Sequence, residues 1–295
     1  MKGVSKMEIS GMQTITSRQN PVVVWAVKLE DKKERERSRS FRFDGVKLFA
    51  EAIRSGVELT HILFRQSSLE SVLEKTEKIV GRTLSSFDVE FGKNCRICEI
   101  SDSVFDKIST EKAPEGVICV GKYIDKFHKI ATINKVGSNE VQYKEEKIIL
   151  AESVRDPSNL GAVIRCAVAM GIDRLILSSD CADIYNSKTV RASMGTLFSL
   201  KISIAEDMCT VIQELRESGR RVFAATLTKD AQRLGEFELF SHDCIVIGNE
   251  GHGLSDKIID ACDKRVFIPI ADGAESLNAA TAASIFMWEL RKSSL

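Results

Sequence analysis

From Ile148 onwards the sequence alternates between short apolar runs and longer stretches whose apolar residues recur at helical spacing. The apolar runs predict strands at residues 148–151, 174–177, 200–204, 221–227, 244–247 and 265–270. The longer stretches predict helices at residues 160–170, 207–217, 254–262 and 276–291. Strands that alternate with helices of this length form a parallel sheet with helices on both faces. We therefore predict a doubly wound α/β domain.

The first part of the chain predicts a smaller α/β domain, because helical and extended patterns also alternate there. A length of 295 residues is enough for two domains. The stretch 122–147 is polar, has few apolar repeats and contains Gly137-Ser138-Asn139. We predict domains at residues 1–121 and 148–295, joined by a linker at residues 122–147.

The charge is balanced overall but not locally. Lysine and arginine number 42, as do aspartate and glutamate, so the total predicts no general affinity for polyanions. A cluster of cations in the first domain predicts a phosphate-binding surface: Lys32, Lys33, Arg35, Arg37, Arg39 and Arg42. Four acids are interleaved with them, so a solvated helix with ion pairs explains the same pattern. Both interpretations stay open on charge alone.

The eight cysteines do not predict a disulfide scaffold, because most lie in or beside apolar runs where a free thiol packs well. Cys95 and Cys98 form a C-x-x-C pair, but no second pair lies near it at zinc spacing. We expect no metal site. No stretch has the length of a membrane span, and the N-terminus lacks a signal-peptide pattern. We therefore expect a cytoplasmic protein that does not bind membranes.

A glycine-rich loop follows the predicted strand at 244–247 and includes Gly248, Glu250, Gly251 and Gly253. Glycine lets a ligand approach the main chain, and the carboxyl edge of a parallel sheet is where α/β proteins bind ligands. The loop matches neither a P-loop nor the G-x-G-x-x-G pattern. It predicts a ligand held by main-chain groups that is neither a triphosphate nor a dinucleotide. The alternative is a turn with a solvated glutamate.

Polar residues mark three other places at the same predicted edge. Arg165 is the only charge on an apolar helix that begins near Asn159, and a guanidinium there needs an anion unless it reaches past the helix edge into water. Thr226 and Leu227 end a predicted strand. Ser276 and Asn278 begin a helix of small residues, where Ser276 could serve only as the N-cap. Because these residues and the glycine-rich loop all lie at one edge of the predicted sheet, we expect them to form a single functional site.

Three ordered motifs resemble the signatures of the SpoU/TrmH family, RNA ribose 2′-O-methyltransferases of the SPOUT class: DPSNLGAVIRCAVAMG, IVIGNEGHGL and IPIADGAESLNAATAAS. The first domain is similar to an L30e/L7Ae-like RNA-binding module through SRQNPVV, FRFDGVKLFAEA and APEGVICV. Asp44-Gly45 stands where Glu-Gly is more usual, which keeps the carboxylate. The polar stretch 122–147 is a second departure, which we interpret as an insertion.

The resemblance implies a deep trefoil knot in the C-terminal domain, a homodimer, and an S-adenosylmethionine pocket at the knot. Carried over by position, it implies cofactor contacts at Thr226, Leu227, Gly248, Ile268 and Leu277. It implies a catalytic constellation of Asn159, Arg165, Glu250, Ser276 and Asn278. It also implies that the first domain binds RNA, with Arg35 and Arg39 on phosphates.

These residue types suit methyl transfer to a ribose hydroxyl, which is a poor nucleophile at neutral pH and must be positioned. We expect Arg165 to hold the phosphate beside the target ribose, because an ordinary guanidinium stays protonated and is a poor base. Asn159 would orient Arg165 or the ribose. Glu250 would order the loop or pair with Arg165.

Ribosomal RNA is the expected substrate, and transfer RNA is the alternative within the family. A catalytically inactive RNA-binding dimer is a further alternative, although the catalytic residues are all present. A dehydrogenase would need G-x-G-x-x-G after a strand of the first domain, and the sequence has none there. No DNA partner is expected.

Overall fold

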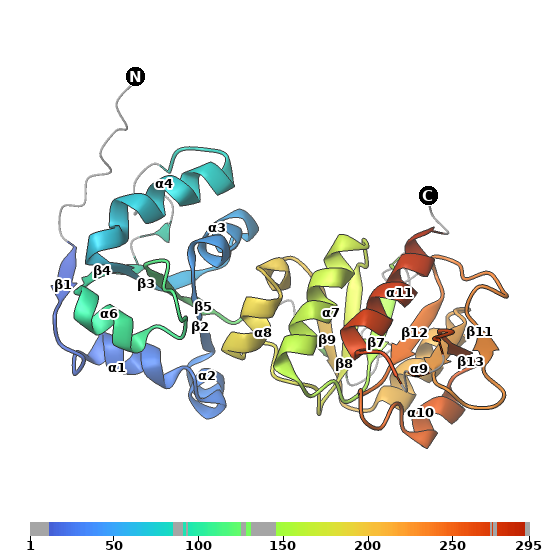
Figure 1. The fold of residues 1–295 in the computed structure, drawn as a ribbon. Coiled ribbons are helices and arrows are strands. Elements are labelled where there is room, and N and C mark those ends of the chain that lie inside the picture. The colour runs from blue at the N-terminus through green and yellow to red at the C-terminus, as the bar shows by residue number, and fades with distance from the viewer. Residues whose placement is uncertain are drawn as a thin grey trace. The chain divides into compact units, whose positions relative to one another are not determined.

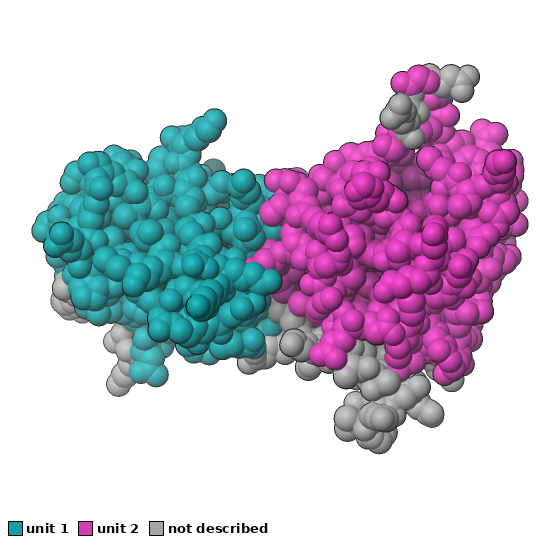
Figure 2. Space-filling view, turned by 90° about the horizontal axis from the view of Figure 1, so that it is seen from below, with its two compact units in different colours: residues 1–124, 185–198 teal, residues 125–184, 199–295 magenta. Residues whose placement is uncertain are grey.

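A computed structural model of the protein describes residues 12–84, 91–92, 94–124, 128–130, 146–271, 273 and 276–292. The chain divides into two compact units, shown in Figures 1 and 2. The first unit comprises residues 1–124 and 185–198, and the second comprises residues 125–184 and 199–295. Residues 185–198, which lie within the predicted second domain at 148–295, therefore belong to the first unit. Most of the predicted linker lies outside the described residues.

The first unit is built on a sheet of five strands in the order β1-β4-β3-β5-β2. β1 and β3 run parallel to β4, whereas β5 is antiparallel to β3 and β2. The strands are β1 (Gln13–Ile15), β2 (Ser40–Asp44), β3 (Leu59–Arg65), β4 (Arg96–Ile100) and β5 (Val117–Lys122). The helices are α1 (Pro21–Lys28), α2 (Lys32–Ser38), α3 (Val46–Ser55), α4 (Leu69–Val80) and α6 (Asp102–Ile108), with a 3₁₀ turn at Gln66–Ser68.

Local sequence sets these boundaries. Pro21 opens α1, and the side chain of Asn20 accepts a hydrogen bond from the Val22 amide. α3 begins after Gly45, whose φ of +108° suits glycine alone, and ends at Gly56 in the left-handed region. The buried face of α1 packs with residues of β3, β4, β5 and α6 in one apolar core.

The segment 185–198 completes the aromatic core of the first unit. Phe198 is 1% exposed, and its ring centroid lies 5.3 Å from that of Phe43 and 6.1 Å from that of Phe41. Tyr185 packs on Phe41 at 4.8 Å and stacks on Tyr123 at 3.9 Å. Because these partners come from β2 and the end of β5, the segment is an internal part of this unit.

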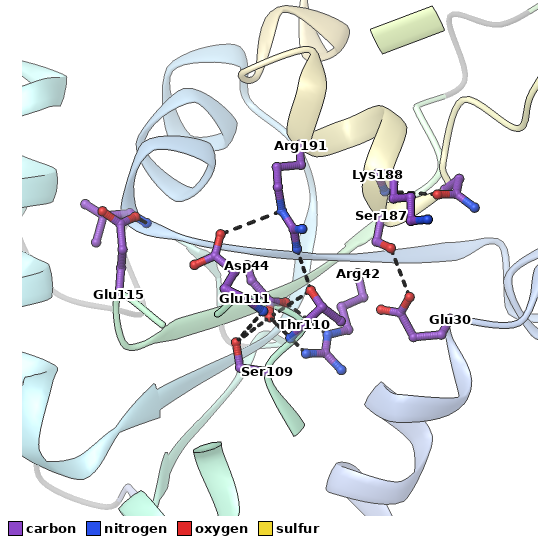
Figure 3. Close-up of polar contacts among 12 residues, drawn as sticks. Glu30, Arg42, Asp44, Ser109, Thr110, Glu111, Glu115, Ser187, Lys188 and Arg191 are labelled. Atoms are coloured by element: carbon purple, nitrogen blue, oxygen red, sulfur yellow. Dashed lines mark hydrogen bonds and ion pairs between the residues drawn. The ribbon is translucent and has the colours of Figure 1, made fainter. Parts of the chain in front are cut away.

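Polar contacts fix the same segment through α8 (Ser187–Ala192), as Figure 3 shows. The Ser187 hydroxyl donates to the Glu30 carboxylate at 2.9 Å. Arg191 donates to the Thr110 hydroxyl at 2.7 Å and lies 3.8 Å from the Glu111 carboxylate. A 3₁₀ turn at Thr196–Phe198 ends the segment.

The second unit has a sheet in the order β11-β13-β10-β12-β7-β8-β9-β6, and every strand pair in it is parallel. The predicted parallel sheet is confirmed. Its strands are β6 (His128–Ile130), β7 (Ile148–Ala151), β8 (Arg174–Ser178), β9 (Lys201–Ala205), β10 (Val222–Ala225), β11 (Gln232–Arg233), β12 (Cys244–Ile247) and β13 (Lys264–Phe267). β6 lies inside the predicted linker and pairs with β9.

Helices cover both faces of this sheet: α7 (Pro157–Ala169), α9 (Met208–Glu217), α10 (Asp256–Ala261) and α11 (Ala279–Lys292). α9 and α10 share an apolar core with alternate residues of β7, β8, β10 and β12. α11 packs against α7 and β12, and Figure 1 draws these two helices side by side. After β7 the chain goes to β8 on one side and later returns to β12 on the other, which places a topological switch point at β7.

Two predicted strands are shorter than expected. β10 ends at Ala225 instead of residue 227, and β13 ends at Phe267 instead of residue 270. The residues beyond them leave the ladder at the carboxyl edge of the sheet. They line a cavity there.

Candidate cofactor and catalytic site

A cavity of about 450 Å³ opens at the carboxyl ends of β10, β12 and β13, next to the start of α11. Its volume is in the range of small-molecule sites. All five residues predicted to contact a cofactor line it: Thr226, Leu227, Gly248, Ile268 and Leu277. Glu250 and Ser276 line it as well. Leu227 is 64% exposed at the cavity wall.

The loop at residues 248–255, here called the cofactor loop, folds back on itself. The Asn249 amide donates to the Gly253 carbonyl at 3.2 Å, and the Gly253 amide donates to the Asn249 carbonyl at 2.9 Å. A Cβ atom on Gly248 would lie 2.4 Å from the Gly253 carbonyl carbon. Only glycine allows the two limbs of the loop to approach this closely. The cavity is lined in part by Gly248, Gly251 and Gly253 of this loop, which carry no side chain.

Three of the predicted catalytic residues form one hydrogen-bonded chain. The side-chain amide of Asn278 donates to Oδ1 of Asn159 at 2.9 Å, and the Asn159 amide donates to Oε1 of Glu250. Asp156 caps α7 by accepting from the Asn159 amide N–H at 2.9 Å. The chain of contacts therefore joins the starts of α7 and α11 to the cofactor loop, although 119 residues separate Asn159 from Asn278.

Ser276 is exposed at the cavity, and it does not cap the last helix. α11 begins at Ala279, and Oδ1 of Asn278 accepts from the Ala280 amide at 2.9 Å. The alternative of Ser276 as the N-cap is wrong, because Asn278 occupies that position. Ser276 therefore has no capping role in α11.

Arg165 lies on α7 and is exposed, and within the described part of the chain its guanidinium has no hydrogen bond or ion pair. The guanidinium therefore carries no cost of burial. The alternative prediction, in which the Arg165 side chain reaches past the helix edge into water, is the one that the structure shows. Arg165 does not line the cavity. Its guanidinium is accessible to an anionic substrate.

The two predicted RNA-binding arginines differ. Arg35 is 3% exposed, and its Nη1 donates at 2.7 Å to the carbonyls of Leu29 and Glu30, which follow α1. A guanidinium that satisfies main-chain carbonyls in the interior cannot reach a phosphate, so the prediction for Arg35 is wrong. Arg39 is exposed and lies over the Tyr123 ring at 4.8 Å from its centroid. Arg39 stays a candidate for RNA contact.

The cluster of cations divides in the same way. Arg42 is 2% exposed and pairs with Asp44 at 3.0 Å, whereas Arg37 pairs with Glu34 at the surface. Alternating charge does not tell which side chains turn inward. The predicted phosphate surface is thus reduced to its exposed members.

Neither a metal site nor a membrane span emerges from the described residues. No three of their His, Cys, Asp and Glu side chains are grouped so as to hold a metal ion. None of the described helices is both long and apolar enough to cross a membrane. Burial, with a smaller effect of Cys98, raises the pKa of Cys95 to about 12, so this thiol is protonated at neutral pH.

The sequence analysis missed some residues of the site. Phe286 and Ala282 of α11 line the cavity, and their spacing from Ala279 is that of one helix face, which was a usable signal. Glu152 and Asn249 also hold the loop. The sequence marked Glu152 only by its place shortly before the first motif and Asn249 only by its place inside the second.

Family models match both parts of the chain. The SpoU rRNA Methylase family matches residues 146–288. The MRM3-like substrate binding domain matches residues 20–119. The two matches fall on the parts that carry the two sheets.

The chain is similar along most of its length to two curated enzymes. The 23S rRNA (guanosine(2553)-2'-O)-methyltransferase RlmP of Bacillus subtilis is 29% identical over 282 residues, 95% of this chain and 100% of that protein. The 23S rRNA (uridine(2479)-2'-O)-methyltransferase of Streptomyces viridochromogenes is 27% identical and covers 93% of this chain and 90% of its own.

A solved structure is also similar over nearly the whole chain. The AdoMet-bound rRNA methyltransferase of Sinorhizobium meliloti has a TM-score of 0.78 and 27% identity, and the match covers 96% of this chain and 99% of that one. The match therefore extends over both units of the present chain.

Proposed function

Because the chain belongs to the SpoU rRNA Methylase family and carries an MRM3-like substrate binding domain, we propose that it methylates a ribose 2′-hydroxyl of 23S-type ribosomal RNA with S-adenosylmethionine. One observation supports this most strongly. The hydrogen-bonded chain from Asn278 through Asn159 to Glu250 ends at a glycine-lined cavity of about 450 Å³.

The cavity fits the cofactor in two respects. Gly248, Gly251 and Gly253 line the cavity without side chains, which leaves their main-chain groups open to a ligand. Leu227 exposes an apolar side chain that a bound ligand would cover. Gly248, Ile268 and Leu277 would hold the cofactor through main-chain groups, with Thr226 and Leu227 beside them. When bound, S-adenosylmethionine supplies a methyl group on a positively charged sulfur, which is already activated for transfer.

The remaining task for the protein is to present the ribose oxygen. Arg165 would hold the phosphate next to the target ribose, because a guanidinium binds phosphate oxygens in a fixed geometry. Asn159 has both ends of its amide engaged, so it gives the site a rigid edge on which the ribose can be oriented. Ser276 would contribute a hydroxyl to the ribose or the cofactor. Glu250 orders the loop through Asn159.

The RNA would be held by the first unit through exposed cations that include Arg39. Ribosomal RNA is preferred over transfer RNA because the two full-length relatives described above are named for 23S rRNA. A cytoplasmic location follows from such a substrate.

The proposal includes a homodimer through the second unit. Trp288 on α11 is 46% exposed, and aromatic side chains are enriched at protein interfaces. Light scattering in solution is expected to give twice the mass of the chain, and Trp288→Glu is expected to lower it. A monomeric wild-type protein would contradict this part. The trefoil knot stays a prediction.

Methyl transfer from radiolabelled S-adenosylmethionine to unmodified ribosomal RNA and unmodified transfer RNA tests the proposal. Label is expected in 23S rRNA at an alkali-resistant linkage, which distinguishes ribose from base methylation. Arg165→Ala is expected to reduce transfer by about a hundredfold or more while cofactor affinity changes little.

The other outcomes are equally informative. Label in transfer RNA alone would move the substrate to the other branch of the family. Cofactor binding without label in any free RNA would point to an assembled ribosomal particle. If the protein binds no cofactor, the proposed enzyme is refuted and the RNA-binding dimer remains.

A further inference from the structure

Glu152 follows β7 directly and lies beneath the cofactor loop. It is 8% exposed, and its amide donates to the Ile247 carbonyl at 2.9 Å, across the ends of β7 and β12. Its carboxylate accepts two hydrogen bonds from Ser255, one from the amide N–H at 2.8 Å and one from the hydroxyl at 2.6 Å. A buried carboxylate thus meets the far end of the loop with both oxygens.

The Ser255 hydroxyl bonds to Glu152 and not to the helix that Ser255 precedes. It occupies the N-cap position of α10, but its side chain makes no hydrogen bond to that helix. A serine at this position normally bonds to an amide of the first turn. Its hydroxyl donates to Glu152 instead, so the contact fastens the loop at the expense of the helix cap.

The position of Ser255 controls the wall of the cavity. Ser255 follows Gly253 and Leu254, and these two residues touch Gly248 so closely that a Cβ there would lie 2.4–2.6 Å from their main-chain atoms. Gly248 and Gly253 line the cavity, whereas Glu152 does not. A shift of Ser255 would therefore move the limb of the loop against which Gly248 rests.

A second tie holds the loop to the same stretch of chain. The Asn249 side chain donates to the Ser153 carbonyl at 2.8 Å and accepts from the Gly251 amide at 2.8 Å. Ser153 has a φ of +56°, which is unusual for a residue other than glycine. Its amide donates to the Ser178 hydroxyl and its hydroxyl donates to the Asp180 carboxylate. Ser153 is thus fixed in the conformation that directs its carbonyl to Asn249.

We propose that Glu152 is a positioning residue for methyl transfer, whose carboxylate holds the cofactor loop in its binding conformation through Ser255. It does not line the cavity, so it would act through the loop. The inference rests on the proposed function, because it assumes that the cavity takes S-adenosylmethionine. It adds a role that the catalytic motifs do not supply.

Glu152→Gln tests the role with little change of shape. An amide keeps one acceptor but places an NH₂ group against one of the two Ser255 donors, so one contact is lost. The dissociation constant for S-adenosylmethionine, measured by calorimetry, is expected to rise about tenfold or more. The KM for the cofactor should rise in parallel, while kcat at saturating cofactor stays close to that of the wild type.

Substitutions at Ser255 provide a second test, with a smaller expected effect on cofactor affinity. Ser255→Ala keeps the backbone N–H contact and is expected to weaken binding by a few-fold, whereas Ser255→Thr keeps the hydroxyl and should restore it. In the combined Glu152→Gln/Ser255→Ala variant, the fold-loss of cofactor affinity should be smaller than the product of the two single fold-losses. The reason is that both substitutions disturb the same Glu152–Ser255 contact.

Glu146 is a matched control at the other end of β7. It is 7% exposed and accepts from Arg174 at 2.7 Å and from Lys201 at 2.8 Å, far along the strand from the loop. Glu146→Gln should lower the unfolding temperature without changing cofactor affinity. If Glu152→Gln behaves like Glu146→Gln, Glu152 is merely structural and the inference is refuted. A wild-type protein that binds no cofactor would instead refute the proposed function itself.

Discussion

The side-chain NH₂ of Asn278 donates a hydrogen bond to Oδ1 of Asn159 at 2.9 Å. Oδ1 of Asn278 accepts from the backbone N–H of Ala280, also at 2.9 Å. Asn278 therefore serves two purposes with the two ends of one amide. It caps α11 and it fixes Asn159, which in turn donates to Glu250. The two purposes can be separated by substitution.

Asn278→Asp is expected to keep the cap and lose the contact with Asn159, because a carboxylate accepts from the helix but has no donor. Methyl transfer should fall by about tenfold to a hundredfold, while the unfolding free energy stays near that of the wild type. Asn278→Ala should lose both, with about 1 kcal/mol of stability for the missing cap. Equal activity of Asn278→Asp and wild type would show that the contact is not needed.

Gly248→Ala should abolish cofactor binding. Its methyl group would lie 2.4 Å from the Gly253 carbonyl carbon and 2.6 Å from the Leu254 nitrogen, so the two limbs of the loop would have to separate. Gly251→Ala is the matched control in the same loop, since its methyl group would meet only the Asn249 side chain at 3.4 Å. Calorimetry of both variants measures the difference. Normal binding by Gly248→Ala would contradict the role of the close contact.

Arg35→Ala should destabilise the protein, because it leaves the carbonyls of Leu29 and Glu30 without the donors seen in the structure. The expected loss is about 1–3 kcal/mol in the free energy of unfolding. Chemical denaturation of the variant measures it.

Arg39→Glu should have the opposite profile, since Arg39 is at the surface. Stability should change little, whereas RNA affinity should fall and lose part of its dependence on salt. Unaltered RNA binding over a range of salt concentrations would leave Arg39 as part of a solvated face.

Two thiols with raised pKa values predict a loss of stability in alkali. Burial raises the pKa of Cys244 to about 11 despite the nearby Arg220, and burial together with Asp263 raises that of Cys262 to about 12. Because the folded protein keeps these protons longer than the unfolded chain, unfolding releases them above a pH of about 9, the usual range for a thiol. Stability should fall as the pH rises from about 9 towards these values, measured by denaturation at several pH values.

Cys244→Ala tests the link between thiol ionisation and stability by removing one of the two thiols. Its stability should fall less steeply with pH above about 9 than that of the wild type, because one of the linked thiols is gone. Its neutral-pH stability should be lower, since a buried side chain has been shortened. An unchanged slope would remove Cys244 from the linkage.

Two strands with buried residues on both faces were predictable to the residue. β7 and β12 occupy the predicted ranges 148–151 and 244–247, because each is a short run of buried residues bounded by a change in polarity. The starts of helices were less predictable, as α11 shows. Ser276 and Asn278 are both good caps by chemistry, and only the contact with Asn159 decides between them.

Residues whose partners are distant in sequence could not be placed from pattern alone. Arg35 is one cation among several, and nothing in its neighbours shows that it turns toward the end of α1. The site residues came mainly from the resemblance to known motifs. Spacing alone placed Asn159, Glu250 and Asn278 at one edge of a sheet without predicting that they touch.

The insertion of residues 185–198 into the first unit has a consequence for synthesis. Domains generally fold as units, the N-terminal one first, while the ribosome is still at work. Here Phe41 and Phe43 pack against Phe198, so β7, α7 and β8 must all be translated before that packing can form. A nascent chain halted ahead of Phe198 leaves this aromatic surface without its cover and open to chaperones. The first unit is thus completed only after residues 125–184 of the second unit have been made.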